Sequence, residues 1–150
     1  MFTEEKRDAI YPHVIAVIAA VGYLYLNYKY PQHTLPKNLK DLLTASATIN
    51  SIVVGFLATA KATLLSISGG RAIKFMKSGG KYNVLIEYFM TAVHYSILTA
   101  VTSALMLLFN FEKLPPYAAY FICFWVFLSV GSLFSGYRII RLYSTILRNN

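Results

Sequence analysis

Long apolar segments alternate with short polar ones along the whole chain. Four apolar segments, at residues 10–28, 42–68, 84–109 and 117–137, lie near or above the roughly 20 residues that a helix needs to cross a ~30 Å hydrocarbon core. The first is expected to hold Pro12 in its opening turn. The pattern predicts an all-α, polytopic membrane protein in which residues 1–150 form one domain of four transmembrane helices.

The basic residues are distributed unevenly between the two sides of this arrangement. Of 14 Lys and Arg residues, nine lie before the first segment, between the second and third, or after the fourth. Four lie in the other two connections, and Lys61 lies inside a segment. Because basic residues are retained on the cytoplasmic side, this bias predicts that both termini are cytoplasmic.

The second segment carries an unusual polar stripe. At 100° per residue its small and hydroxylated residues share one face, with Asn50 and Lys61 at the edge. One interpretation is close helix packing, which small residues allow, and the other is a pore lining in a ring of subunits. The stripe consists of Thr44, Thr48, Ser51, Gly55, Thr59, Ala62 and Ser66.

Ionisable side chains at membrane depth form a second group. Glu87, Thr91, His94 and Thr102 share one face of the third segment. Lys61 and Glu87 lie at roughly similar depths, ~10 and ~7 Å from the cytoplasmic end, which predicts an ion pair, within or between subunits, unless each snorkels separately. His94 lies roughly 18 Å deep, where it donates to a neighbouring helix or acts as a proton sensor.

Small residues of the fourth segment and basic residues outside the segments predict contacts. Two interleaved small-xxx-small pairs favour a tight helix contact and, with the stripe, a homo-oligomer. The basic residues are expected to bind anionic lipid headgroups or a cytoplasmic partner protein, whereas direct nucleic-acid binding is disfavoured. The small residues are Gly131, Ser132, Ser135 and Gly136, and the basic ones are Arg71, Lys74, Lys77, Lys81, Arg138 and Arg141.

No constellation of residues predicts enzyme chemistry. The sequence has no metalloprotease, nucleophile-elbow, phosphate-loop or CxxC motif. Its three histidines lack metal-ligand spacing, so neither a metal nor another cofactor is expected. An enzyme built on Glu87 and His94 and a secondary transporter are both disfavoured, the latter because inverted repeats and broken helices are missing.

Residues 56–95 resemble RexB-type phage-exclusion membrane proteins. The likeness lies in the apolar run 56–67, the basic loop ending at Lys81-Tyr82, and the apolar run 84–95. Size and layout are also similar to the Kiwa membrane subunit and to membrane accessory proteins of RNA-targeting CRISPR loci. The resemblance implies a multi-pass bacterial inner-membrane protein of an anti-phage system, acting as a homo-oligomeric pore or membrane-stress sensor. The alternatives are a non-conducting anchor that recruits a cytoplasmic effector through the basic loop and tail, and a holin-like lysis protein.

Overall fold

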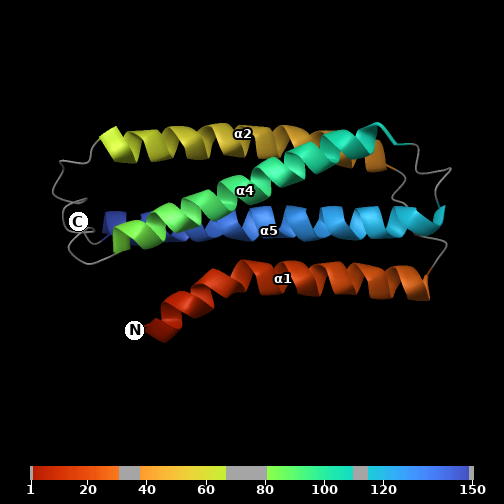
Figure 1. Ribbon diagram of the computed structural model, residues 1–150, viewed down its shortest axis with the longest axis horizontal. Helices are drawn as coiled ribbons and strands as arrows, with labels where there is room; N and C mark the ends of the chain where they lie inside the picture. The colour runs from red at the N-terminus through yellow and green to blue at the C-terminus, as the bar shows by residue number, and fades with distance from the viewer. Residues whose placement is uncertain (1, 31–37, 67–80, 110–114, 149–150) are drawn as a thin grey trace.

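Four long helices make up the described part of the chain in the computed structural model. It describes residues 2–30, 38–66, 81–109 and 115–148, with side chains at 10–30, 38–62, 82–109 and 117–141. The helices are α1 (Phe2–Lys29), α2 (Leu39–Ser66), α4 (Lys81–Leu107) and α5 (Pro115–Arg148) (Figure 1). Each contains a stretch long and apolar enough to cross a membrane: Ile10–Lys29, Leu39–Ala62, Tyr82–Leu107 and Tyr117–Arg141. The predicted all-α architecture with four spanning helices is therefore confirmed.

The helices are ordered α2, α4, α5, α1 by their main contacts. Helix α2 packs on α4, α4 on α5, and α5 on α1. Figure 1 shows α4 crossing α5 diagonally and the two termini at the same end of the bundle. We call this the terminal end; the charge bias predicts that it is cytoplasmic. As expected from the short connection between them, α4 and α5 are antiparallel neighbours.

Helix α1 begins earlier than the apolar pattern suggested, so the predicted position of Pro12 in an opening turn is wrong. The helix starts at Phe2 and Pro12 lies inside it, with its ring fully buried. A proline in a helix interior lacks an N–H and its ring crowds the carbonyl of residue i−4, which bends the helix. Figure 1 shows this bend in α1, and the polar N-terminal turns lean away from the bundle beyond it.

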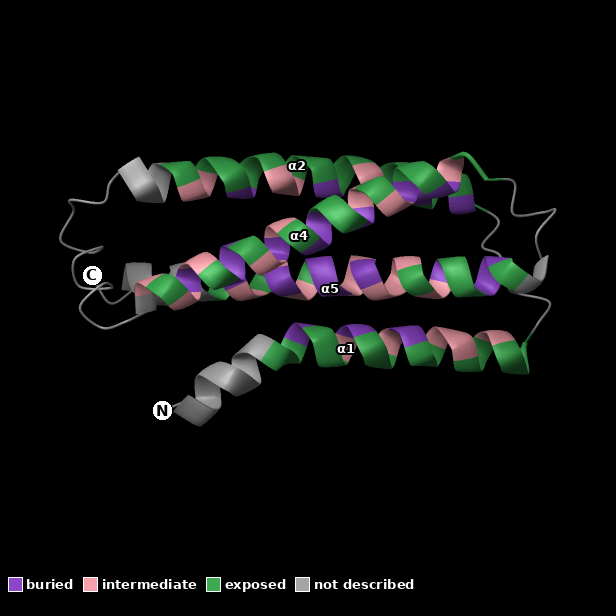
Figure 2. Ribbon diagram, viewed as in Figure 1, coloured by how far each residue is buried: buried purple, intermediate pink, exposed green. Residues whose placement is uncertain are grey.

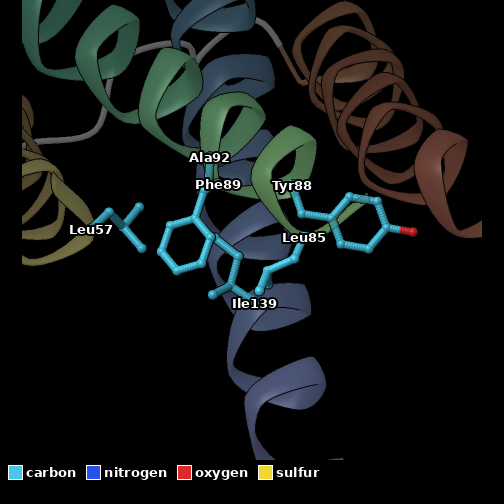
Figure 3. Packing of buried hydrophobic residues seen from close by; sticks show 6 residues of the cluster. All are labelled: Leu57, Leu85, Tyr88, Phe89, Ala92 and Ile139. Carbon is cyan, nitrogen blue, oxygen red and sulfur yellow. The ribbon is translucent and has the colours of Figure 1, made fainter. Parts of the chain in front are cut away.

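The bundle interior has an apolar cluster at each end. The cluster at the terminal end is built around Phe89, whose ring lies between Leu57 of α2 and Ile139 of α5 (Figure 3). The cluster at the opposite end joins the same three helices through Leu43, Met106 and Ile122. Figure 2 shows buried residues on the faces that the helices turn toward one another and exposed residues on the outer faces. The middle of the bundle, between the two clusters, is polar.

Candidate functional site

Asn50 is the centre of a hydrogen-bond network between the two apolar clusters. Its Nδ2 donates to the Ser46 carbonyl one turn earlier (2.8 Å), and its Oδ1 accepts from Ser132 Oγ of α5 (2.6 Å). Ser132 Oγ also lies 2.9 Å from Ser96 Oγ of α4. Asn50, Ser96 and Ser132 are all buried. Both ends of the Asn50 amide are thus used inside the bundle.

A second set of contacts extends the network toward the opposite end of the bundle. Trp125 Nε1 of α5 donates to Ser103 Oγ of α4 (2.8 Å), and Ser103 Oγ donates to Ser46 Oγ of α2 (3.3 Å). Ser46 in turn bonds Asn50, so the hydroxyls, the amide and the indole connect α2, α4 and α5. Because an unsatisfied polar group is costly in hydrocarbon, these bonds favour one register of the three helices.

Helix α1 is attached to the bundle through Tyr95. The Tyr95 hydroxyl lies 2.5 Å from His13 Nδ1 of α1, and the buried ring of Tyr95 lies against Gly131 of α5. A side chain at position 131 would overlap that ring. Tyr11 and Phe134 add an edge-to-face contact with ring centroids 5.9 Å apart. Glycine at position 131 is therefore what allows Tyr95 to bridge α5 and α1.

The small residues of α5 are mostly used inside the chain. Gly131, Ser132 and Ser135 are buried, which places their contacts within the subunit. Ser135 Oγ has no hydrogen-bond partner in the described part of the chain. Gly136 is different, because a Cβ added there would meet nothing within 4 Å.

The polar stripe of α2 faces away from the chain's other helices. Thr44, Thr48, Ser51, Gly55 and Thr59 are all exposed, as is Ala62. Each of the four hydroxyls donates to the carbonyl four residues earlier on α2, at 2.8–2.9 Å. A Cβ at Gly55 would also meet nothing within 4 Å. The stripe is therefore not a packing surface within one subunit, and the side chain of Ser66 lies outside the described residues.

The outer face of α4 carries two exposed ionisable groups. Glu87 and His94 are exposed, and no hydrogen bond or ion pair to either side chain is found within the residues whose side chains are described. Thr91 is half-buried between them, and its Oγ1 donates to the Glu87 carbonyl (2.9 Å). His94 lies about 18 Å along the helix from Tyr82. In a single subunit its imidazole would face lipid.

Lys61 and Glu87 do not form an ion pair within the chain. The half-buried Lys61 instead places its Nζ 3.2 Å from Met90 Sδ of α4, a weak acceptor. The intrasubunit form of the predicted pair is therefore wrong. Pairing of Lys61 with Glu87 of a second copy stays a prediction.

A charge exchange tests that intersubunit pair. Lys61→Glu and Glu87→Lys are each expected to reduce the oligomeric fraction in detergent several-fold, because each places like charges together. The double variant is expected to restore it, as measured by light scattering after size exclusion. A double variant that remains as dissociated as the single ones would contradict the pair.

Only two of the six basic residues predicted to contact headgroups or a partner have described side chains. Arg138 is half-buried, with its guanidinium 3.5 Å from the Tyr88 ring centroid, a cation–π contact. Arg141 is exposed at the end of the α5 span. Lys81 begins α4, but its side chain, like Arg71, Lys74 and Lys77, lies outside the described residues. Among the described residues no group of three His, Cys, Asp or Glu side chains could hold a metal.

Sequence reasoning missed most of the network except Asn50 and Ser132. Ser96, Thr99 and Ser103 are all buried and recur at intervals of three and four on α4, a helical stripe opposite Glu87 and His94. That periodicity was the available signal. Trp125 offered another, since an indole N–H in a membrane interior needs an acceptor.

No family of known proteins, no curated protein and no solved structure matches this chain. The resemblance to RexB-type proteins therefore stays a prediction.

Proposed function

We propose that the protein is a homo-oligomeric membrane protein in which the outer polar faces of α2 and α4 meet other copies and line a pore or a stress-sensitive gate. The observation that carries the proposal is the contrast between two sets of polar residues. Asn50, Ser96 and Ser132 find partners inside the subunit, whereas Glu87 and His94 are exposed and have none among the residues whose side chains are described.

The cost of lipid exposure supports this assignment. A charged side chain at the centre of a membrane costs roughly 2.5–3.5 kcal/mol on insertion scales, and such residues usually face protein or water. Glu87 lies near enough to the terminal end to reach the headgroups, but His94 does not. Small residues such as Gly55 on α2 allow backbones to approach closely, which favours contact with a second copy. Formation of a homo-oligomer would cover the outer polar faces of both α2 and α4.

The sequence resemblance supplies a cellular setting for the proposal. In phage-exclusion and related defence systems, a small membrane protein disturbs or monitors the inner membrane, and residues 56–95 resemble one such family. This segment contains Thr59, Lys61, Glu87, Thr91 and His94, all exposed or half-buried polar residues of α2 and α4. We therefore place the protein in the bacterial inner membrane, as a defence component working with a cytoplasmic partner protein.

Ion flux tests the pore. Proteoliposomes containing the whole chain are expected to release K⁺ faster than empty liposomes, and His94→Leu or Glu87→Gln is expected to lower the rate about tenfold by changing the lining. Lys40→Gln, which removes a charge from exposed Lys40 at the opposite end of the bundle, is expected to conduct like the wild type. Flux equal to that of empty liposomes would overturn the pore.

A non-conducting anchor is the second candidate, and the hydroxyls of α2 favour it. Each already donates to a carbonyl of its own helix, so none requires water. In this case the stripe would pack against another copy, and the basic residues at the terminal end would recruit a soluble effector. An oligomer that forms without flux would support the anchor.

A further inference from the structure

An apolar groove opens on the bundle surface between α2 and α5 near the terminal end. Its volume is about 470 Å³, within the range of about 300–1,000 Å³ typical of small-molecule sites. Phe89 of α4, which is 0% exposed, forms its floor, and Figure 3 shows this ring between Leu57 and Ile139. Phe56 and Ile140, 70% and 66% exposed, form the two rims. The groove is therefore deep at α4 and open to the side.

The lining of the groove selects an apolar occupant. Among its described lining residues Thr59 is the only polar one, and the Thr59 hydroxyl donates to the Gly55 carbonyl at 2.9 Å. The remaining lining is aliphatic or aromatic. A ligand in the groove thus gains burial of apolar surface without needing to supply a hydrogen-bonding group.

The position of the groove in the membrane indicates which apolar molecule reaches it. On α2 it covers residues 56–60, within the final two turns of the span Leu39–Ala62. On α5 it ends at Ile140, directly before Arg141 at the end of the span Tyr117–Arg141. The groove consequently lies toward the terminal end of both spans, and exposed Arg141 follows its last lining residue in the sequence without lining it.

We propose that this groove binds one acyl chain of an anionic phospholipid from the leaflet at the terminal end, with the phosphate held near Arg141. Basic side chains between transmembrane helices at this depth favour anionic headgroups. Among the residues whose side chains are described, Lys61, Arg138 and Arg141 are basic residues at this end and Glu87 is the acidic one. A second copy would bring the same basic residues to this end of the bundle, whereas an anionic lipid headgroup is complementary to them.

The extent of the groove also favours a lipid over a helix. Within the residues whose side chains are described, it covers just over one turn of α2, at residues 56–60, and only Ile139 and Ile140 of α5. Helix pairs in membranes pack along a face of several turns, as α4 does on α5. An acyl chain can fill one turn and continue into the bilayer. This inference is independent of ion conduction, and a negative flux result would leave it intact.

The test is native mass spectrometry of the whole chain released from nanodiscs of equal phosphatidylglycerol and phosphatidylcholine, which reports bound lipid and subunit number together. The wild type is expected to retain phosphatidylglycerol at least fivefold over phosphatidylcholine. Ala60→Leu, which fills the groove, is expected to lower lipid retention at least fivefold. Ala58→Leu is the matched control, because Ala58 is exposed and does not line the groove, and it is expected to retain lipid like the wild type.

The headgroup contact is tested in the same measurement. Arg141→Gln is expected to keep a bound phospholipid but lose the preference for phosphatidylglycerol, while Lys40→Gln at the opposite end keeps the preference. If Ala60→Leu does not fold, as judged by circular dichroism, Ile140→Phe fills the groove from the α5 rim instead. Two results would overturn the proposal: equal retention of both lipids by the wild type, or unchanged lipid retention in the filled variant, including the case in which the filled variant also dissociates an oligomer. That case would identify a second copy as the occupant.

Discussion

Replacing Gly131 by alanine is expected to destabilise the folded bundle by about 2 kcal/mol, within the range for overpacking a tight core. The added methyl group would overlap the ring of Tyr95, which is buried and bonded to His13. The ring cannot move away freely, because it also packs against Phe127 at a centroid distance of 6.1 Å. Reversible unfolding by sodium dodecyl sulfate in mixed micelles, followed by circular dichroism, measures the loss.

Gly136→Ala is the matched control for this change. It adds the same methyl group to the same helix, but nothing lies within 4 Å of the new atom. We expect its free energy of unfolding to stay within about 0.5 kcal/mol of the wild type. Tyr95→Ala should reduce the extra cost of Gly131→Ala, since the overlap is then removed and the two changes couple. Equal stability of the two glycine variants would contradict the role assigned to Gly131.

The spans could be predicted from the sequence because each depends on local composition alone. An apolar run such as 117–137 is long enough to cross a bilayer whatever its neighbours are, and the structure places a span at Tyr117–Arg141. The residues at which the helices begin and end were less predictable. Helix α1 continues to Phe2 through polar residues, and α5 continues to Arg148, because helical hydrogen bonds do not require an apolar sequence once the chain has left the membrane.

The direction in which each polar residue faces could not be predicted in the same way. On α2 the hydroxyl stripe was the more conspicuous pattern, yet it faces outward, and the buried face is marked by Leu43, Asn50 and Leu57. Helical periodicity separates two faces but does not say which one meets a neighbouring helix. That choice depends on partners distant in sequence, such as Ser132, which lies 82 residues from Asn50.

The polar groups of the subunit divide into a buried, hydrogen-bonded set in the interior and an exposed set on the outer faces. Inside, the Asn50 network lies between apolar clusters around Met106 and Phe89, so the interior formed by the described side chains offers no continuous polar path along the bundle. Outside, the hydroxyl-bearing residues of α2 and the ionisable residues Glu87 and His94 of α4 are exposed. A conducting path, if the protein forms one, would therefore run between subunits and not through one of them.

Asn50→Asp is expected to be the most damaging single change, lowering the free energy of unfolding by about 3 kcal/mol at neutral pH. The two side chains have nearly the same shape, so the cost comes from a carboxylate that loses the Nδ2 donor to the Ser46 carbonyl and places charge in a dry interior. Asn50→Leu removes the hydrogen bonds without adding charge, and we expect a loss of about 1 kcal/mol, since such bonds contribute about 0.6–1.7 kcal/mol in membranes. The same detergent unfolding titration measures both.

Asn83→Asp provides the control for charge alone. Asn83 is exposed in the first turn of α4, where an acidic side chain interacts favourably with the helix N-terminus. Its stability is expected to equal or slightly exceed that of the wild type. The predicted order of stability is therefore Asn83→Asp, then Asn50→Leu, then Asn50→Asp. If the two Asn50 variants were equally stable, the carboxylate would have to be hydrated, and the network would lie in a water-filled path through the subunit.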